Sequence, residues 1–432
     1  MRRVGEVVDA ATVCTAAAVA GVTLFLPDTI DSYGEATPYQ IASLLDSAPR
    51  SAALAVVIAV TTAVLVTMTA RPLAGWIAAM LAMLVELLND FAGGRAPTAE
   101  MLTTQNYIDS MCAGVVLGGL GAAVLRRPLA GAALAVGSIG FFSFGDLAEF
   151  LGIERNPYAM LQTPPHWMLE IALTLLVISV FRNWAHTREP KEPQLSITLP
   201  VAPIIAAMVL ASAVLAGTAW LSRQYDKLPA ASHTIEIGVV VAATLVSATA
   251  AAMLLPGRDG TGVYLAVSFT PAVGAMGYAV QSGWGAVVLL TLTAIGVAIG
   301  SRLSSAALAI LLIIILAIVA MLTPAVTEPV AFAAVSAFIA ITAGYCCGTA
   351  RPRYAPSGVL AITALYLPTV VSAIPNMHSD WRHDAQIHET LPGRAALAIA
   401  IGSAVGLAAL HKLRPRNTAP PEGGSETDRH RA

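Results

Sequence analysis

Long apolar stretches follow one another along almost the whole chain and leave only short polar connections between them. A helix needs roughly 17 to 25 mostly apolar residues to cross a bilayer, and it satisfies its backbone hydrogen bonds internally, as lipid requires. Only 12% of the residues are charged, which is about half the share in soluble proteins. We therefore predict an all-α polytopic transmembrane helix bundle of about 14 spans, within a range of about 12 to 14. The stretches lie near 10–27, 51–70, 73–92, 107–125, 129–151, 165–184, 199–221, 234–255, 261–280, 284–301, 304–323, 329–347, 356–374 and 394–411.

The distribution of positive charge predicts how these spans are oriented. Cytoplasmic loops of membrane proteins carry an excess of Lys and Arg. If the N-terminus lies in the cytoplasm, seventeen of the 24 Lys and Arg residues fall on the inner side. An even number of spans then returns the C-terminus to that side. We predict an N-in, C-in, multi-pass protein of the inner or plasma membrane, in contact with membrane lipid.

A polar segment, "AHTREPKEPQ", divides the predicted spans into a set of six and a set of eight. The two spans at 261–280 and 284–301 are short, and a re-entrant hairpin is an alternative for them. The end of the chain is rich in Pro, Gly, Ser and Glu, a composition typical of disorder. We predict a six-span bundle at 1–184, a cytoplasmic linker at 185–198, a two-span hairpin at 199–256, a second six-span bundle at 257–415 and a disordered cytoplasmic tail at 416–432.

Carboxylates interrupt several apolar stretches in the first half of the chain, notably Glu86, Asp90, Asp146 and Glu149. An ionised carboxylate at mid-bilayer costs about 3 kcal/mol on insertion scales, and no Lys or Arg lies inside these spans to pair with it. Each acid therefore lies near water, lines a wet cavity or binds a proton. Glu86 is the deepest, so we predict that it carries a proton, with the other three in an acidic outer vestibule. Asp109 and Glu170 are better explained as residues at helix ends.

A short sequence echo favours grouping two of these acids. "RPLAG" begins at Arg71 and again at Arg127, and an aspartate follows nineteen residues after each arginine, at Asp90 and Asp146. Two helices that start at the same depth and rise 1.5 Å per residue bring these aspartates to the same level, near the outer boundary.

A histidine-rich connection, "HSDWRHDAQIHE", is the strongest candidate for a metal site. Imidazole and carboxylate groups at helical spacing can hold a divalent ion. The spacing matches no established metal motif, and a solvated outer loop explains the residues better. The weak candidate ligands are His378, Asp380, His383, Asp384 and His388. The four cysteines show no CxxC spacing, and no nucleotide-binding motif occurs, so we predict no cofactor, no resident metal and no nucleic-acid partner.

Two stretches resemble the major facilitator superfamily of transporters. "GYAVQSGWGAVVLLTLTAIGVAIGSRL" at 277–303 is similar to the family's outer turn entering a helix at Gly-Trp, and "GRDGTG" at 257–262 resembles its cytoplasmic Gly/Asp/Arg loop. The layout of six spans, a charged linker and a second helical set also resembles the family, including its 14-span drug:proton branch. "TMTARPLAGW" lacks the family's Gly-x-x-x-Asp-x-x-Gly-Arg signature. The resemblance implies alternating access between two bundles and assigns no functional residue.

We accordingly predict a transporter, not an enzyme, that exports a small-molecule substrate by proton coupling. An anionic vestibule favours amphipathic or cationic solutes. One alternative is a lipid-linked glycan flippase or a GT-C-type polyprenyl-phosphate glycosyltransferase, with Asp28 or Asp31 as the catalytic acid after the first span. Another is a non-catalytic membrane assembly subunit, which would tolerate neutralisation of every membrane acid.

Overall fold

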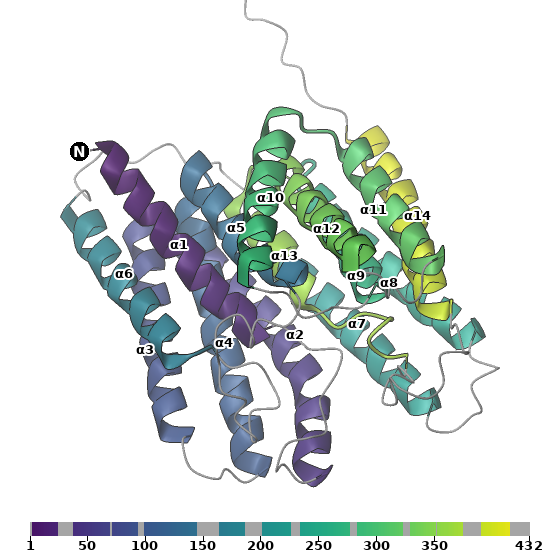
Figure 1. Ribbon diagram of the computed structural model, residues 1–432, viewed down its shortest axis with the longest axis horizontal. Helices are drawn as coiled ribbons and strands as arrows, with labels where there is room; N and C mark the ends of the chain where they lie inside the picture. The colour runs from purple at the N-terminus through teal and green to yellow at the C-terminus, as the bar shows by residue number, and fades with distance from the viewer. Residues whose placement is uncertain are drawn as a thin grey trace, which may run out of the picture.

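The computed structural model describes residues 2–24, 38–69, 71–93, 99–144, 164–185, 201–225, 234–276, 283–322, 329–350, 352–374 and 390–414. All regular structure in these residues is helical, as the sequence predicts (Figure 1). The helices are α1 (Arg2–Leu24), α2 (Pro38–Thr69), α3 (Pro72–Gly93), α4 (Ala99–Val124), α5 (Pro128–Phe144), α6 (His166–Ala185), α7 (Ala202–Tyr225), α8 (Thr234–Leu254), α9 (Thr261–Gly274), α10 (Gly283–Arg302), α11 (Ala306–Leu322), α12 (Pro329–Thr349), α13 (Ala355–Thr363) and α14 (Leu391–Leu413).

Each predicted apolar stretch overlaps one of these helices. Within the described residues, nine helices are long and apolar enough to cross a bilayer, and five further apolar helices are shorter. The protein is therefore a multi-pass helical membrane protein. The exact number of spans and their N-in, C-in orientation stay predictions.

One helix is much shorter than its predicted span at 356–374. α13 ends at Thr363 and continues as one 3₁₀ turn to Tyr366. Leu367 then adopts an extended backbone, with φ −67° and ψ 143°. The cause is Pro368, because a residue that precedes proline is driven out of the helical region.

The helices of the two halves pair in the same order. In the first half α1 packs against α5, α2 against α4 and α3 against α6. In the second half α9 packs against α13, α10 against α12 and α11 against α14. Adding eight to each helix number of the first half gives its counterpart in the second. The two halves lie side by side, purple to teal on the left of Figure 1 and green to yellow on the right.

Two equivalent sets of helix pairs join the halves. α5 packs against α10 and α12, and α13 packs against α2 and α4; these contacts exchange under the same offset of eight. α7 and α8 pack against each other, with α7 also on α2 and α8 also on α14. α9 and α10 pack mainly against different helices, and the connection between them at 277–282 lies outside the described residues, so two spans and a re-entrant hairpin at 261–301 both stay predictions.

Glycine permits the closest approach within both halves. A Cβ on Gly118 of α4 would lie 2.2 Å from the carbonyl oxygen of Ala59 on α2. A Cβ on Gly344 of α12 would lie 2.1 Å from the carbonyl oxygen of Thr293 on α10. Small residues let membrane helices pack with their backbones nearly in contact. The pairs α2–α4 and α10–α12 are therefore equivalent in their packing chemistry as well as in order.

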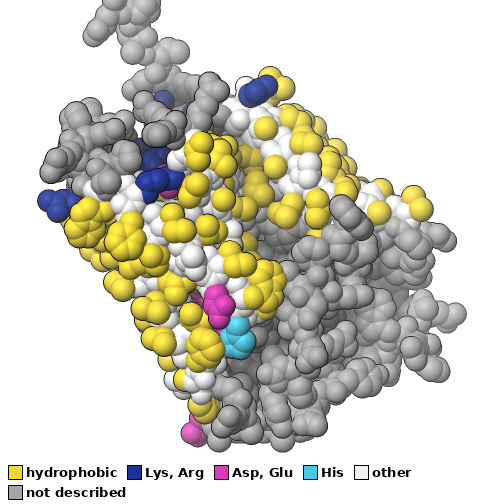
Figure 2. Space-filling model, turned by 60° about the vertical axis from the view of Figure 1, so that its left-hand side comes forward, with side chains coloured by type: hydrophobic (Ala, Val, Ile, Leu, Met, Phe, Trp, Pro, Cys, Tyr) yellow, Lys and Arg dark blue, Asp and Glu magenta, His cyan; other side chains and the backbone are white. Residues whose placement is uncertain are grey.

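Where Figure 2 colours the described residues, the surface is mostly apolar, and basic side chains gather toward its upper end. Exposed apolar side chains on α3 and α6 include Leu88, Phe181 and Ile178. A soluble protein rarely leaves large contiguous apolar patches in water, so this face suits contact with lipid.

Candidate functional site

Glu86 on α3 is the most deeply buried acid at the end of the bundle that the sequence places outside, with 2% of its surface exposed. The hydroxyl of Thr23 on α1 donates a hydrogen bond to Oε1 of Glu86 over 2.7 Å. Oε2 is buried and has no hydrogen-bond partner among the described residues. A buried acceptor left without a partner is costly, and such groups are rare in native structures.

A second acid lies next to this site on α4. Nδ2 of Asn89 donates to Oδ1 of Asp109 over 2.7 Å, and Asp109 is close enough to repel a charge on Glu86. The sequence interpretation of Asp109 as a helix-end residue rested on a span that began near 107. α4 begins at Ala99 instead, so Asp109 lies in its third turn and faces α3.

Asp90, one turn beyond Glu86 on α3, contacts the first residue of α6. Nδ1 of His166 lies 2.5 Å from Oδ2 of Asp90. The imidazole ring also stacks on Phe91, with centroids 5.2 Å apart and planes inclined by 13°. Sequence reasoning missed His166. The only signal was "TPPH", because a proline pair followed by a polar residue is typical of a helix start.

Several sequence candidates cannot be placed beside this cluster. Asp146 and Glu149 follow the end of α5 at Phe144 and lie outside the described residues. The same holds for the histidine-rich connection, with His378, Asp380, His383, Asp384 and His388, and for Asp28 and Asp31 of the glycosyltransferase alternative. Nor does the description cover the linker beyond Ala185 or the tail at 416–432.

No metal site is assembled in the parts of the chain that the structure describes, where no three His, Cys, Asp or Glu side chains converge. All four cysteines are free thiols.

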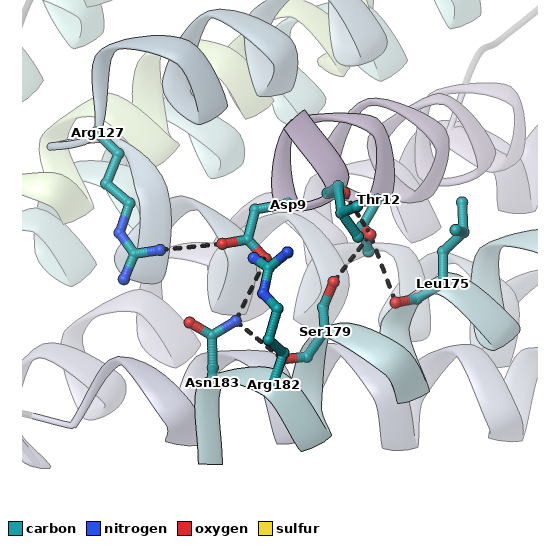
Figure 3. Close-up of polar contacts among 8 residues, drawn as sticks. Asp9, Thr12, Arg127, Leu175, Ser179, Arg182 and Asn183 are labelled. Atoms are coloured by element: carbon teal, nitrogen blue, oxygen red, sulfur yellow. Dashed lines mark hydrogen bonds and ion pairs between the residues drawn. The ribbon is translucent and has the colours of Figure 1, made fainter. Parts of the chain in front are cut away.

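A different arrangement surrounds Asp9 at the opposite end of α1 (Figure 3). Its side chain is 5% exposed, and Oδ2 accepts a hydrogen bond from Nη1 of Arg127 over 3.2 Å. Oδ1 forms an ion pair with Arg182 and accepts from Nδ2 of Asn183 over 3.3 Å. One buried carboxylate thus ties the start of α1 to the residue that precedes α5 and to the end of α6.

The second half carries a counterpart at the start of α9. The buried carboxylate of Asp259 accepts the backbone N–H groups of Arg353, over 3.0 Å, and Tyr354, over 2.9 Å. Burial raises the pKa of Asp259, and these hydrogen bonds oppose the rise. Arg258 beside it donates to the carbonyl oxygen of Arg414 over 2.7 Å. The elements tied together are the starts of α9 and α13 and the end of α14, the counterparts of α1, α5 and α6.

This arrangement gives "GRDGTG" a structural role. The loop connects α8 to α9, and its aspartate satisfies backbone donors at the start of α13, where Tyr354 is the N-cap and makes no side-chain capping bond. A carboxylate at a helix N-terminus is favoured by the unpaired N–H groups and the helix dipole there.

A small apolar cavity of about 70 Å³ lies between the halves. Its walls come from α5, α9, α12 and α13, and they include Ile139, Phe269, Cys346, Cys347 and Leu365. No charged side chain lines it. Sites for drug-sized ligands occupy roughly 300–1,000 Å³, so this space is too small for such a molecule as it stands.

Comparison with known proteins gives structural likeness only. No family model matches the sequence, and no curated protein matches it. A crystal structure of the nucleoside transporter NupG is similar with a TM-score of 0.39 and 11% identity, over 95% of this chain and 98% of that one. A bacterial homologue of the human lysosomal transporter Spinster, in an inward-facing and unoccupied conformation, is similar with a TM-score of 0.31 and 13% identity, over 88% and 96%. At these values neither structure assigns the chain to a family.

Proposed function

We propose that the protein is a membrane transporter of the major facilitator type, in which α1–α6 and α9–α14 alternate in opening to the two sides. The observation that carries the proposal is the repeated helix pairing, since each set packs internally and the two sets meet through α5 on α10 and α12 and through α13 on α2 and α4. Two internally packed units joined along equivalent helices can rock about their interface, as repeat-built transporters do.

The division of the chain follows from the same contacts. The first bundle corresponds to 1–184 and the second to 257–415, with α7 and α8 as the two-span hairpin at 199–256. The hairpin packs mainly against one helix of each bundle, α2 and α14, with smaller contacts to α9 and α13. We propose that the α7–α8 hairpin lies at the periphery of the protein and takes no part in the substrate path, because neither α7 nor α8 lines the cavity between the bundles.

Orientation is the next part of the proposal. Arg127, Arg182, Arg258 and Arg353 belong to the end that holds Asp9 and Asp259, and the positive-inside rule places that end in the cytoplasm. Glu86 and Asp90 then lie toward the outer side. A reporter fused after Lys412 should behave as cytoplasmic, and one inserted within 376–392 should be exposed outside. The opposite pair of results would reverse the orientation.

Proton coupling is assigned to Glu86, supported by its burial and its unpartnered Oε2. Asp90, Asp146 and Glu149 complete the proposed acidic vestibule. A buried carboxyl that is kept without a cation or a full set of hydrogen bonds is a candidate functional group. Inward proton flow through this end would drive export of the solute.

The substrate class follows from the cavity. Its uncharged, apolar walls favour small amphipathic solutes, and a cationic head group would find Glu86 and Asp90 at the outer end. Transport of a strictly hydrophilic solute through this cavity would leave that solute's polar groups unsatisfied.

Thiol reactivity tests whether the bundles separate. Cys346 lines the cavity between the bundles, and Cys112 is buried within the first bundle. Two single-cysteine variants, with the other three cysteines changed to Ser, are treated with N-ethylmaleimide in proteoliposomes. We expect Cys346 to react at a rate set by bundle opening, while Cys112 stays protected. Equal protection of both thiols in the native protein, with reaction only after denaturation, would contradict alternating access.

A further inference from the structure

The hydrogen bond between Thr23 and Glu86 is compatible with either charge state of the carboxyl. The Thr23 hydroxyl lies 2.7 Å from Oε1 of Glu86 and 3.1 Å from the carbonyl oxygen of Val19, one turn back on α1. A hydroxyl has one proton to donate and lone pairs to accept. It donates to an ionised Glu86, or it donates to Val19 and accepts from a protonated Glu86. A site that binds and releases a proton needs such a partner in both states.

Glu86 is buried, whereas the pair beside it lies at helix ends on the side that the sequence places outside, Asp90 in the last turn of α3 and His166 at the start of α6. The side chains of Asp90 and His166 are 28% and 58% exposed, against 2% for Glu86. Glu86 and Asp90 are four residues apart on α3, and side chains at that spacing lie on the same helix face with Cβ atoms about 6 Å apart. One water molecule can bridge two carboxyl groups at that separation.

We propose that His166 and Asp90 form the port through which Glu86 exchanges protons with the outer solution, an inference that rests on the proposed proton-carrying role of Glu86. In the inward step the N–H bond at Nδ1 of the His166 imidazolium breaks and its proton passes to Oδ2 of Asp90. The Asp90 carboxyl then gives up its proton, through a bridging water, to Glu86. The imidazole ring then turns about its Cβ–Cγ bond, takes a new proton on Nδ1 from the outer water and turns back, and release follows the reverse order.

Other charged or titratable groups on the helices packed against α3 stand outside this route. Asp109 and Cys112 on α4 are the ones near Glu86, and Asp109 is engaged by Asn89. Neither provides the exposed imidazole that the route needs at its outer end. The remaining described groups at this end are Arg50 on α2, Glu100 and Tyr107 on α4, and Glu170 on α6.

The test follows protonation of Glu86 directly and needs no substrate. The pH around native protein in lipid nanodiscs is lowered rapidly, and time-resolved infrared spectroscopy records the rise of the C=O stretch of the protonated carboxyl. The band should disappear in Glu86→Gln. Its rise should slow by about a hundredfold in His166→Gln, which is the low end of what a positioned acid or base contributes, and the final amplitude should stay native.

Two controls separate transfer from structural damage. Glu170→Gln changes an exposed acid one turn further along α6 and should leave the rate native. Imidazole added to the buffer should restore the rate of His166→Gln, because its protonated form can replace a missing proton donor but cannot repair a helix start. Asp90→Asn interrupts the same step without changing the imidazole ring and should slow the rise as well.

The outcomes are distinguishable. A native band in Glu86→Gln would overturn the proton-carrying role and the port together. A band that is lost in Glu86→Gln but rises at the native rate in both His166→Gln and Asp90→Asn would overturn the port alone. Slowing in His166→Gln that imidazole does not relieve would also overturn the port, because it assigns the histidine a structural role.

Discussion

Asp9 and Glu86 are buried acids of the same helical bundle. Asp9 lies at the start of α1, and Glu86 of α3 contacts Thr23 at the end of α1. The two carboxyl groups differ in how their oxygens are paired. Asp9 is held by Arg127, Arg182 and the amide of Asn183. Glu86 has the hydroxyl of Thr23 and an oxygen without a partner among the described residues. A fully paired acid stabilises the fold in one geometry, whereas an incompletely satisfied acid costs stability and persists where its charge must change. This difference supports a structural clamp at Asp9 and the proposed proton site at Glu86.

The largest effect on stability is expected at the clamp. Asp9→Asn removes the charge that two guanidinium groups share and should lower the free energy of unfolding by about 3 kcal/mol, the low end of the range for breaking a buried pair. The low end applies because Arg127 is 46% exposed and keeps part of its hydration. Thermal unfolding of the purified protein in detergent measures the loss. An unchanged transition would show that Asp9 is no clamp.

A smaller loss is expected at the counterpart in the second half. Asp259→Asn keeps one carbonyl acceptor for two backbone N–H groups, so one buried donor loses its partner at a cost of about 1–2 kcal/mol. Arg258, which bonds elsewhere, stays unchanged in this variant. A loss as large as that of Asp9→Asn would contradict the difference between an ion-pair clamp and a backbone cap.

The pH dependence of this second loss has a definite sign. Burial raises the pKa of Asp259 above its ordinary value, so the folded protein holds a proton there more readily than the unfolded chain. The resulting stabilisation is fully present below the ordinary pKa and is lost as the pH rises through the raised pKa. The difference in the free energy of unfolding between the native protein and Asp259→Asn should therefore become smaller as the pH rises. Unfolding curves of the native protein and of Asp259→Asn at several pH values measure this difference. A difference that grows with pH would contradict the prediction.

The smallest change in stability is expected at Glu86. Glu86→Gln keeps the shape and one hydrogen-bonding oxygen and removes a charge that no cation balances, so the free energy of unfolding should change by less than about 1 kcal/mol or rise. The same thermal unfolding assay applies. A loss comparable to that of Asp9→Asn would make Glu86 a structural residue like Asp9 and remove the contrast between them.

Sequence patterns predicted the helices because a bilayer requires apolar segments of a set length, and α1 to α14 all fall on predicted stretches. They failed where local chemistry ends or extends a helix, as at Pro368 after α13 and at the early start of α4 that brings Asp109 to face α3. Glu86 and Asp90 stood out as acids in apolar runs. Their partners did not, because Thr23 and His166 lie 63 and 76 positions away from them in the chain. Asp9 meets Arg127 and Arg182 only through packing of α1 with α5 and α6, which no local pattern encodes.

Solute-dependent proton flux tests the role of Glu86 most directly. Protein in proteoliposomes loaded with a pH-sensitive dye is challenged with a panel of small amphipathic and cationic solutes across acidic to mildly alkaline pH. We predict that solutes which evoke proton flux through the native protein evoke none through Glu86→Gln, while Asp90→Asn shifts the half-saturating solute concentration by about tenfold, or about 1.4 kcal/mol. Native flux through Glu86→Gln over the whole pH range would contradict the proton-carrier account.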